Sequence, residues 1–277
     1  QWVHRTAEGS SIGPSLVDPR TGEIIKAAVR MDSYRSLANY NQFAGALGVA
    51  GDPYDVVAPG TDAEAYTMAR RRQHSAHEIG HTLGLAHNFI AVADGRASVM
   101  DYPAPRFELV DGRLSVADAY RAGAGAYDTL AIRFAYEPVP DGMREDEFLN
   151  GLLVEAQSQG WRFITNPDAG ADNAYPDATW WTNGADVPGE LDRMLEDRAV
   201  MLEAFGERAI EPGEPMHKLW RRFAPVYFHH RASYEAAVKT IGGMEYRYGV
   251  RGDPEPVTRL LTAAEVERAM EVLARTI

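Results

Sequence analysis

The chain has 277 residues, of which 45% are hydrophobic and 25% charged, so it is long enough for one large domain or for two lobes around a cleft. Its 28 basic and 40 acidic residues give a net charge of −12, which argues against nucleic acid as a partner, and no run of 18 apolar residues predicts a membrane span. Cysteine is absent, which excludes disulfides, thiolate nucleophiles and cysteine-ligated metal sites.

The first predicted elements along the chain are a hairpin and a long helix. A Pro/Gly turn signal and a following apolar run with β-branched residues predict a hairpin within residues 15–31 that feeds a sheet. Asp62 is a suitable N-cap, and the segment from it to Leu85 has the pattern of one helix that stops at Gly84. Residues 89–113, with several glycines and prolines, are predicted to form an irregular loop rather than an element of the core.

The second half of the chain is predicted to be mainly helical. Helical periodicity is present in residues 115–136, 146–159, 188–205, 219–241 with an interruption at Pro225, and 262–277. Residues 166–186 are rich in Gly, Pro, Asn and Asp and form a long loop of the kind that often borders a binding site. The loop holds Trp180 and Trp181, for which a place in the core is expected and a place in a substrate cleft is the alternative.

Three of the eight histidines are crowded into the stretch HEIGHTLGLAHN, residues 77–88. On a helix, His77 and His81 lie on one face with Cβ atoms roughly 5–6 Å apart, so both imidazoles can bind one ion. In a continued helix His87 would lie ~9 Å farther along the axis and about 120° around it, out of reach of that ion. Gly84 stands where the helix must break, because glycine enters left-handed conformations without a Cβ penalty and can turn the chain back. His87 is therefore predicted to be the third ligand.

Three neutral nitrogen ligands leave one position of a tetrahedral zinc ion open for water, which is typical of catalytic rather than structural sites. Zinc lowers the pKa of such a water to roughly 7. Glu78, beside the first ligand, can accept the proton of that water and later pass it to a leaving amine. The pattern therefore predicts one catalytic Zn²⁺ ion and hydrolysis of a peptide bond.

HEIGHTLGLAH resembles the extended zinc signature of the metzincin metallopeptidases and matches it at all five positions. The resemblance implies that the three histidines bind zinc and that Glu78 is the general base and acid. Metzincins have a tight turn with a methionine beneath the zinc site, and Met100 in SVMDYP looks like that residue. In astacin-like and serralysin-like enzymes a tyrosine two residues later approaches the metal and stabilises the oxyanion, and Tyr102 stands at this spacing. The alternatives are an ordinary core methionine and a packed aromatic residue.

A wider resemblance covers most of residues 10–255. The segments DPRTGEI, SAHEIGHTLGLAHNF, RASVMDYP, YFHHR and GG-x-x-Y-x-Y-x-x-RGD together resemble a family of large bacterial zinc metallopeptidases known mainly through domains of unknown function. The resemblance implies an α/β (α+β) zincin-like domain. Its upper subdomain, residues 1–88, is expected to hold a small twisted sheet and the motif helix, and its mainly helical lower subdomain, residues 89–277, the Met-turn.

The same resemblance bears on completeness and location. Only 76 residues precede His77, so the upper subdomain is expected to be truncated at its start. The given residues contain no signal peptide, and the family resemblance implies a periplasmic or secreted protein.

Other polar residues are weaker candidates for a role at the metal site. His74 is expected to lie next to the ligands or at the surface, and His229 and His230, adjacent in a predicted helix, are expected to pack or cap rather than chelate. Asp101 is expected to hydrogen-bond a ligand histidine or to brace the turn.

Two other segments contain carboxylates that could bind a metal. Glu108 could be the downstream carboxylate ligand found in some HExxH enzymes, but its segment lacks the helix that such a ligand needs. The acidic run at residues 168–173 lacks the spacing of a calcium loop and is expected to be solvated.

The predicted function is zinc-dependent hydrolysis of a peptide or protein substrate. One alternative is a non-catalytic or fragmentary zinc-containing module that binds peptides, which a missing base would favour, whereas Glu78 is present. The other is a metal-dependent hydrolase of a non-peptide amide, because the same zinc chemistry serves either bond.

Overall fold

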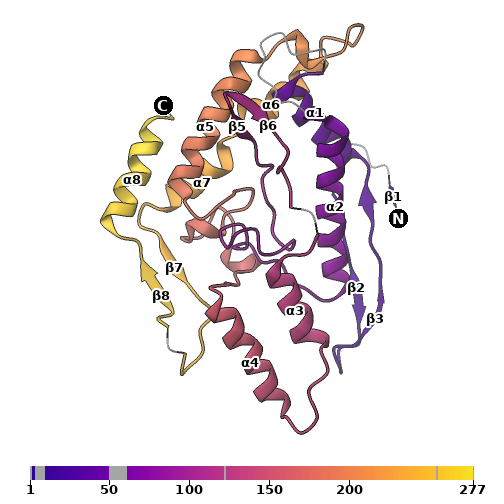
Figure 1. The fold of residues 1–277 in the computed structure, drawn as a ribbon, viewed down its shortest axis with the longest axis vertical. Coiled ribbons are helices and arrows are strands. Elements are labelled where there is room, and N and C mark those ends of the chain that lie inside the picture. The colour runs from indigo at the N-terminus through magenta and orange to yellow at the C-terminus, as the bar shows by residue number, and fades with distance from the viewer. Residues whose placement is uncertain (1, 4–9, 50–60, 122, 254, 277) are drawn as a thin grey trace.

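The computed structural model describes residues 2, 3, 10–49, 61–121, 123–253 and 255–276, which form a mixture of α-helices and short strands (Figure 1). The helices are α1 Tyr34–Leu47, α2 Ala63–Thr82, α3 Ala126–Tyr136, α4 Glu145–Ser158, α5 Val187–Ala204, α6 Lys218–Tyr227, α7 Arg231–Lys239 and α8 Ala263–Ala274. The strands are β1 Trp2–Val3, β2 Ser15–Val17, β3 Ile24–Ala27, β4 Met31–Asp32, β5 Glu108–Val110, β6 Arg113–Ser115, β7 Met244–Tyr246 and β8 Thr258–Leu260. This composition confirms the α+β class.

The strands pair only two by two over the described residues. β1 and β4 are parallel, whereas β2–β3, β5–β6 and β7–β8 are antiparallel hairpins. The predicted hairpin within residues 15–31 is present as β2–β3, and its turn is closed by a 2.8 Å hydrogen bond from Gly22 N to Asp18 O. This hairpin runs beside α2 in Figure 1.

Helix α2 begins at the predicted Asp62 cap and ends at Thr82, slightly before the predicted stop at Gly84. The carboxylate of Asp62 accepts a hydrogen bond from Ala65 N at 2.7 Å, which satisfies one of the free N–H groups of the first turn. At the other end, the Ser15 hydroxyl of β2 donates to the carbonyls of His81 and Thr82, each at 3.4 Å. The hairpin is therefore tied to the end of the helix that carries the histidines.

The largest apolar core lies between the N-terminal helices and the helices α5 and α6. Its buried members are Phe43, Ala46, Leu47, Tyr66, Phe107, Leu114, Val116, Ala119, Tyr120, Met201 and Val226. They include residues on both sides of position 88, since Phe43 of α1 and Val226 of α6 share this core. The division into subdomains 1–88 and 89–277 stays a prediction.

The prediction that residues 89–113 lie outside the core is wrong. Their backbone is irregular up to β5, but Phe89, Ile90 and Ala91 are all 0% exposed. The buried backbone finds partners in other segments, as in the 2.8 Å hydrogen bond from Phe89 N to Ile164 O. Because these partners satisfy its N–H groups, a segment rich in Gly and Pro can be buried without regular structure.

Two helix boundaries also differ from the prediction. The segment 115–136 is helical only from Ala126, where the Asp128 carboxylate accepts from Gly125 N and starts the helix. Pro225 lies inside α6, and the chain breaks instead at residues 228–230, so that His229 and His230 lie in a turn rather than in a helix.

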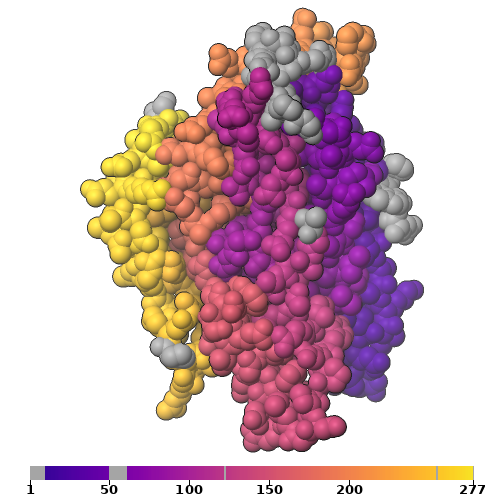
Figure 2. Space-filling view, viewed as in Figure 1, coloured from indigo at the N-terminus to yellow at the C-terminus, as the bar shows by residue number. Residues whose placement is uncertain are grey.

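The N-terminal hairpin and the C-terminal helix lie on opposite sides of the molecule (Figure 1 and Figure 2). In Figure 2, the yellow helix α8 and the indigo β2–β3 hairpin bound the face at left and right, and the α3–α4 hairpin projects at the bottom. Among the described residues, no helix has the length and apolarity that crossing a membrane requires.

Candidate zinc and catalytic centre

Helix α2 brings His77 and His81 together at its C-terminal end. They stand one helical turn apart, and their Nε2 atoms are 3.1 Å from each other. His77 is only 2% exposed. The four-residue spacing places both rings on the face of α2 that is covered by the loop after the helix.

The backbone reverses direction directly after the helix and returns His87 to this face. Gly84 has a φ of +85°, a left-handed conformation in which a side chain is disfavoured. Leu85 N then donates to Gly80 O at 3.0 Å, which closes the turn. His87 Nε2 lies 3.1 Å from His81 Nε2, and the ligand atoms of the three histidines all lie within 4.8 Å of one another.

Hydrogen bonds at the opposite ring nitrogens fix the tautomer of each histidine. Each Nδ1 faces an oxygen that can only accept: His77 faces Val99 O at 2.7 Å, His81 faces Leu85 O at 2.8 Å, and His87 faces Asn166 Oδ1 at 2.8 Å. Each Nδ1 must therefore carry the proton, and each Nε2 presents a lone pair to the other two. Three converging lone pairs repel one another unless a cation lies between them.

The dimensions and charge state of the group fit a zinc ion. Two nitrogens at about 2.0–2.1 Å from a tetrahedral zinc are roughly 3.3–3.4 Å apart, close to the observed Nε2 separations. Burial lowers the pKa of His77 to about 3 and also lowers the pKa of His87, so both rings are neutral, as metal ligands must be.

Glu78 lies beside the histidine group in a buried position. It is 3% exposed, and its Oε1 lies 3.4 Å from Nε2 of His74, one turn back along α2. Burial raises the pKa of Glu78, and the positive charges of Arg35 and Arg70 partly offset this effect. Burial lowers the pKa of His74 to about 2, so this neighbour is a neutral ring packed against the carboxylate, not a surface residue.

Met100 packs beneath the histidine face of α2. Its side chain is 1% exposed, and a Cβ added to Gly80 would lie 2.3 Å from the methionine Sδ. The absence of a side chain at Gly80 is therefore what allows the methionine to approach the helix between two histidines. Asp101 braces this turn and does not bind a histidine: its carboxylate accepts from Val92 N at 2.9 Å and from Tyr102 N at 2.6 Å.

Tyr102 lies against the histidine rings. Its ring centroid is 5.3 Å from that of His77 and 4.8 Å from that of His87. Trp181 stacks on the Tyr102 ring at 5.1 Å with an angle of 18° between the planes. Burial and the charge of Glu78 raise the pKa of Tyr102, so its hydroxyl remains a hydrogen-bond donor.

The other sequence candidates lie elsewhere. His229 packs edge-on against Phe107 at 5.2 Å, and Glu108 forms an ion pair with Arg106 at 2.8 Å. Among the described residues, the group with metal-ligand geometry consists of the three histidines alone, so neither Glu108 nor the acidic run at 168–173 takes part in such a group.

No motif or spacing in the sequence identifies four residues that lie near the site. They are Asn166, Arg35, Arg70 and Trp181, the last as a neighbour of Tyr102. Asn166 is separated from His87 by 79 residues. The composition of residues 166–186 predicts a loop that borders a binding site, but it does not indicate which residue of the loop reaches the histidines. Trp181 is 40% exposed, which corrects the expectation that it belongs to the core.

The helix with two histidines, the glycine turn to the third and the methionine turn beneath them define the catalytic domain of a metzincin-type zinc metallopeptidase. A family model described as Met-zincin (DUF4953) matches residues 60–277, and the chain belongs to this family. Comparison with curated proteins and with solved structures gives no match.

Proposed function

We propose that the chain hydrolyses peptide bonds with a single zinc ion held by His77, His81 and His87. The observation that carries this proposal is the convergence of three unprotonated Nε2 atoms beside the buried carboxylate of Glu78. Bound zinc would supply Lewis acidity, polarising the scissile carbonyl and acidifying water.

The residues of the chain supply the remaining functions. Glu78 accepts a proton from the attacking water and passes it to the leaving amine, a role for which a carboxylate with a raised pKa is suited because it can hold the proton between the two steps. The hydroxyl of Tyr102 donates a hydrogen bond to the oxyanion that forms on the scissile carbonyl. Met100 supports the histidine face from below and touches no substrate.

The proposal includes the expected two-lobed organisation, with residues 1–88 above and 89–277 below the site, and a location outside the cytoplasm. A peptide or protein substrate follows from the family. The presence of a buried glutamate beside the first histidine supports catalysis over the alternative of a non-catalytic peptide-binding module.

The test separates metal binding from turnover. Glu78→Gln keeps the shape of the side chain but cannot accept a proton, so zinc content should stay at one ion per chain while the cleavage rate of a peptide library falls roughly 10²–10⁴-fold. Glu64→Gln, an exposed change in the first turn of the same helix, serves as the matched control and should cleave normally. Normal cleavage by Glu78→Gln would exclude Glu78 as the base. Cleavage of non-peptide amides but not of peptides would favour the alternative substrate class.

A further inference from the structure

A second polar feature adjoins the proposed catalytic centre. A cavity of about 480 Å³ opens beside Trp181, the residue that stacks on Tyr102. It is lined by Arg35 of α1, Arg70 of α2 and Tyr120, and also by residues of α6, α7 and the turn between them. Among the latter, Arg231 and Glu235 form an ion pair with each other at 3.3 Å. The cavity is therefore placed to receive the part of a substrate next to the scissile bond.

Arg35 has an unpaired charge in this cavity. Its Nε is buried without an acceptor, and over the described residues it takes part in no ion pair or hydrogen bond. Burial and the neighbouring charge of Arg70 lower the pKa of Arg35, while Glu78 acts in the opposite direction. A guanidinium in such surroundings gains free energy from an added anion.

Arg70 is held in place without a carboxylate partner. It is 4% exposed and donates to the neutral side chain of Gln73. Its guanidinium lies over the rings of Tyr120 at 5.2 Å and Trp181 at 5.8 Å. These contacts orient the group but leave its charge uncompensated by any ion pair within the described part of the chain.

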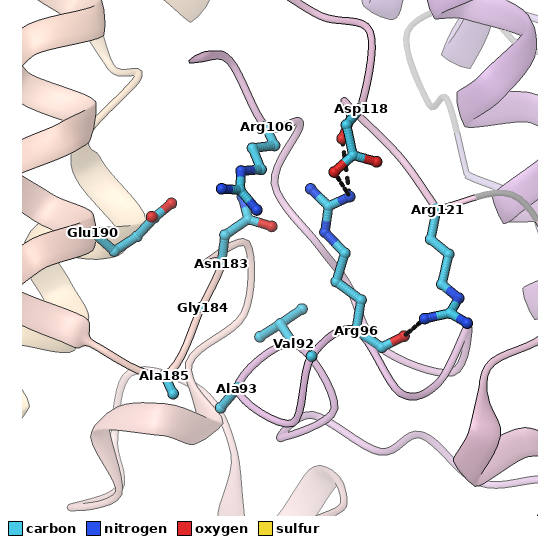
Figure 3. A pocket seen from close by; sticks show the side chains of 11 residues that line it. Val92, Ala93, Arg96, Arg106, Asp118, Arg121, Asn183, Gly184, Ala185 and Glu190 are labelled. Carbon is cyan, nitrogen blue, oxygen red and sulfur yellow. Dashed lines mark hydrogen bonds and ion pairs between the residues drawn. The ribbon is translucent and has the colours of Figure 1, made fainter. Parts of the chain in front are cut away.

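Arg96 and Arg106 line a different cavity and show the contrasting case. It measures about 410 Å³, and Figure 3 shows Arg96 pointing at Asp118, with which it forms an ion pair of 3.2 Å. Arg106 on the same cavity pairs with Glu108 at 2.8 Å. Arg96 and Arg106 are thus compensated by carboxylates, and Arg121 on the same cavity donates to the backbone carbonyl of Arg96. Arg35 and Arg70, by contrast, form no ion pair within the described part of the chain.

We propose that Arg35 and Arg70 form a carboxylate-binding subsite, and that the preferred substrates are peptides with a carboxylate next to the cleaved bond. The inference rests on the proposed peptidase function. Arg35, at the cavity wall and without a hydrogen-bond acceptor among the described residues, makes the direct contact, and Arg70 adds charge from a fixed position. The carboxylate has two possible sources, an aspartate or glutamate side chain or the free C-terminus of a short peptide.

Three otherwise identical peptides distinguish these sources. The first has an acidic side chain and an amidated C-terminus, the second is neutral with a free C-terminus, and the third is neutral and capped at both ends. The chain should cleave the first or the second with a kcat/KM roughly tenfold or more above that of the third, as expected for one charge-assisted contact. Equal values for all three peptides would overturn the inference.

Substitutions connect the preference to the arginines. Arg35→Gln should reduce the ratio of kcat/KM for the carboxylate peptide to kcat/KM for the capped peptide to near one. Arg35→Lys keeps the charge but not the planar guanidinium, so it should retain part of the preference. Arg106→Gln removes the same charge from the other cavity and should leave the ratio as in the unmodified chain. A ratio unchanged by Arg35→Gln in a protein with an unaltered circular dichroism spectrum would also overturn the inference.

A binding measurement keeps this test separate from that of the peptidase function. In the Glu78→Gln background, titration calorimetry with the same peptides should show roughly tenfold tighter binding of a carboxylate peptide, and Arg35→Gln should abolish the difference. If the chain cleaves nothing, the proposed function fails but the binding difference still supports the subsite. If cleavage occurs and the binding difference is absent, the subsite fails alone.

Discussion

Asn166 accepts a hydrogen bond from His87, and its substitution tests whether this bond fixes the tautomer in which His87 can bind a metal. Its Oδ1 lies 2.8 Å from His87 Nδ1, from a loop 79 residues away in sequence. Asn166→Ala removes the acceptor that keeps the proton on Nδ1 and the lone pair on Nε2. Loss of such an orienting partner typically weakens metal binding 10–100-fold. Because Asn166 is exposed, water can replace part of the contact, so we expect the lower end, about tenfold or about 1.4 kcal/mol.

Competition with a chromophoric chelator measures this change in zinc affinity. Asn166→Asp keeps an acceptor at the same place and should bind zinc at least as tightly as the unmodified chain. Asn150→Ala, an exposed asparagine at a distance on α4, is the matched control and should have no effect. The same affinity in Asn166→Ala as in the control would refute the claim that this hydrogen bond selects the ligand tautomer.

Two further predictions concern the turn beneath the site. Gly80→Ala should destabilise the chain by up to about 2 kcal/mol, because overpacking against Met100 costs about 1–3 kcal/mol and the higher helix propensity of alanine offsets about 1 kcal/mol. In a Met100→Ala background the overpacking is absent, so Gly80→Ala should stabilise the chain by about 1 kcal/mol. Urea unfolding of the four proteins gives the coupling energy, and equal effects of Gly80→Ala in both backgrounds would contradict the contact. Burial raises the pKa of Asp101 from 3.8 to about 7. Between these values the folded chain retains a proton that the unfolded chain has lost, so Asp101 lowers the stability by up to about 1.4 kcal/mol per unit as pH rises from about 4 to 7. The free-energy difference between Asp101→Asn and the unmodified chain should therefore grow over this window, and a constant difference would show that Asp101 is ionised throughout.

Local sequence signals predicted the elements that hold the site. The Asp62 cap, the helical spacing of the first two histidines and the left-handed glycine at 84 all act between residues close in the chain. The β2–β3 hairpin follows from its turn in the same way. The helix start at 126 was missed because the Asp128 cap also depends on a distant loop, where it accepts from Val99 N at 2.9 Å.

The sequence by itself determined which side chains can meet at the centre, because helix periodicity and glycine conformation are properties of neighbouring residues. Tertiary structure alone decided how they are held. The acceptor for His77 is the backbone carbonyl of Val99, a group that every residue has and that no sequence pattern can single out. The acceptor for His87 comes from a distant loop. It also decided that Arg35 forms no ion pair with a carboxylate of the described residues, because the pairing of a charge depends on which elements pack around it and not on its place in the chain.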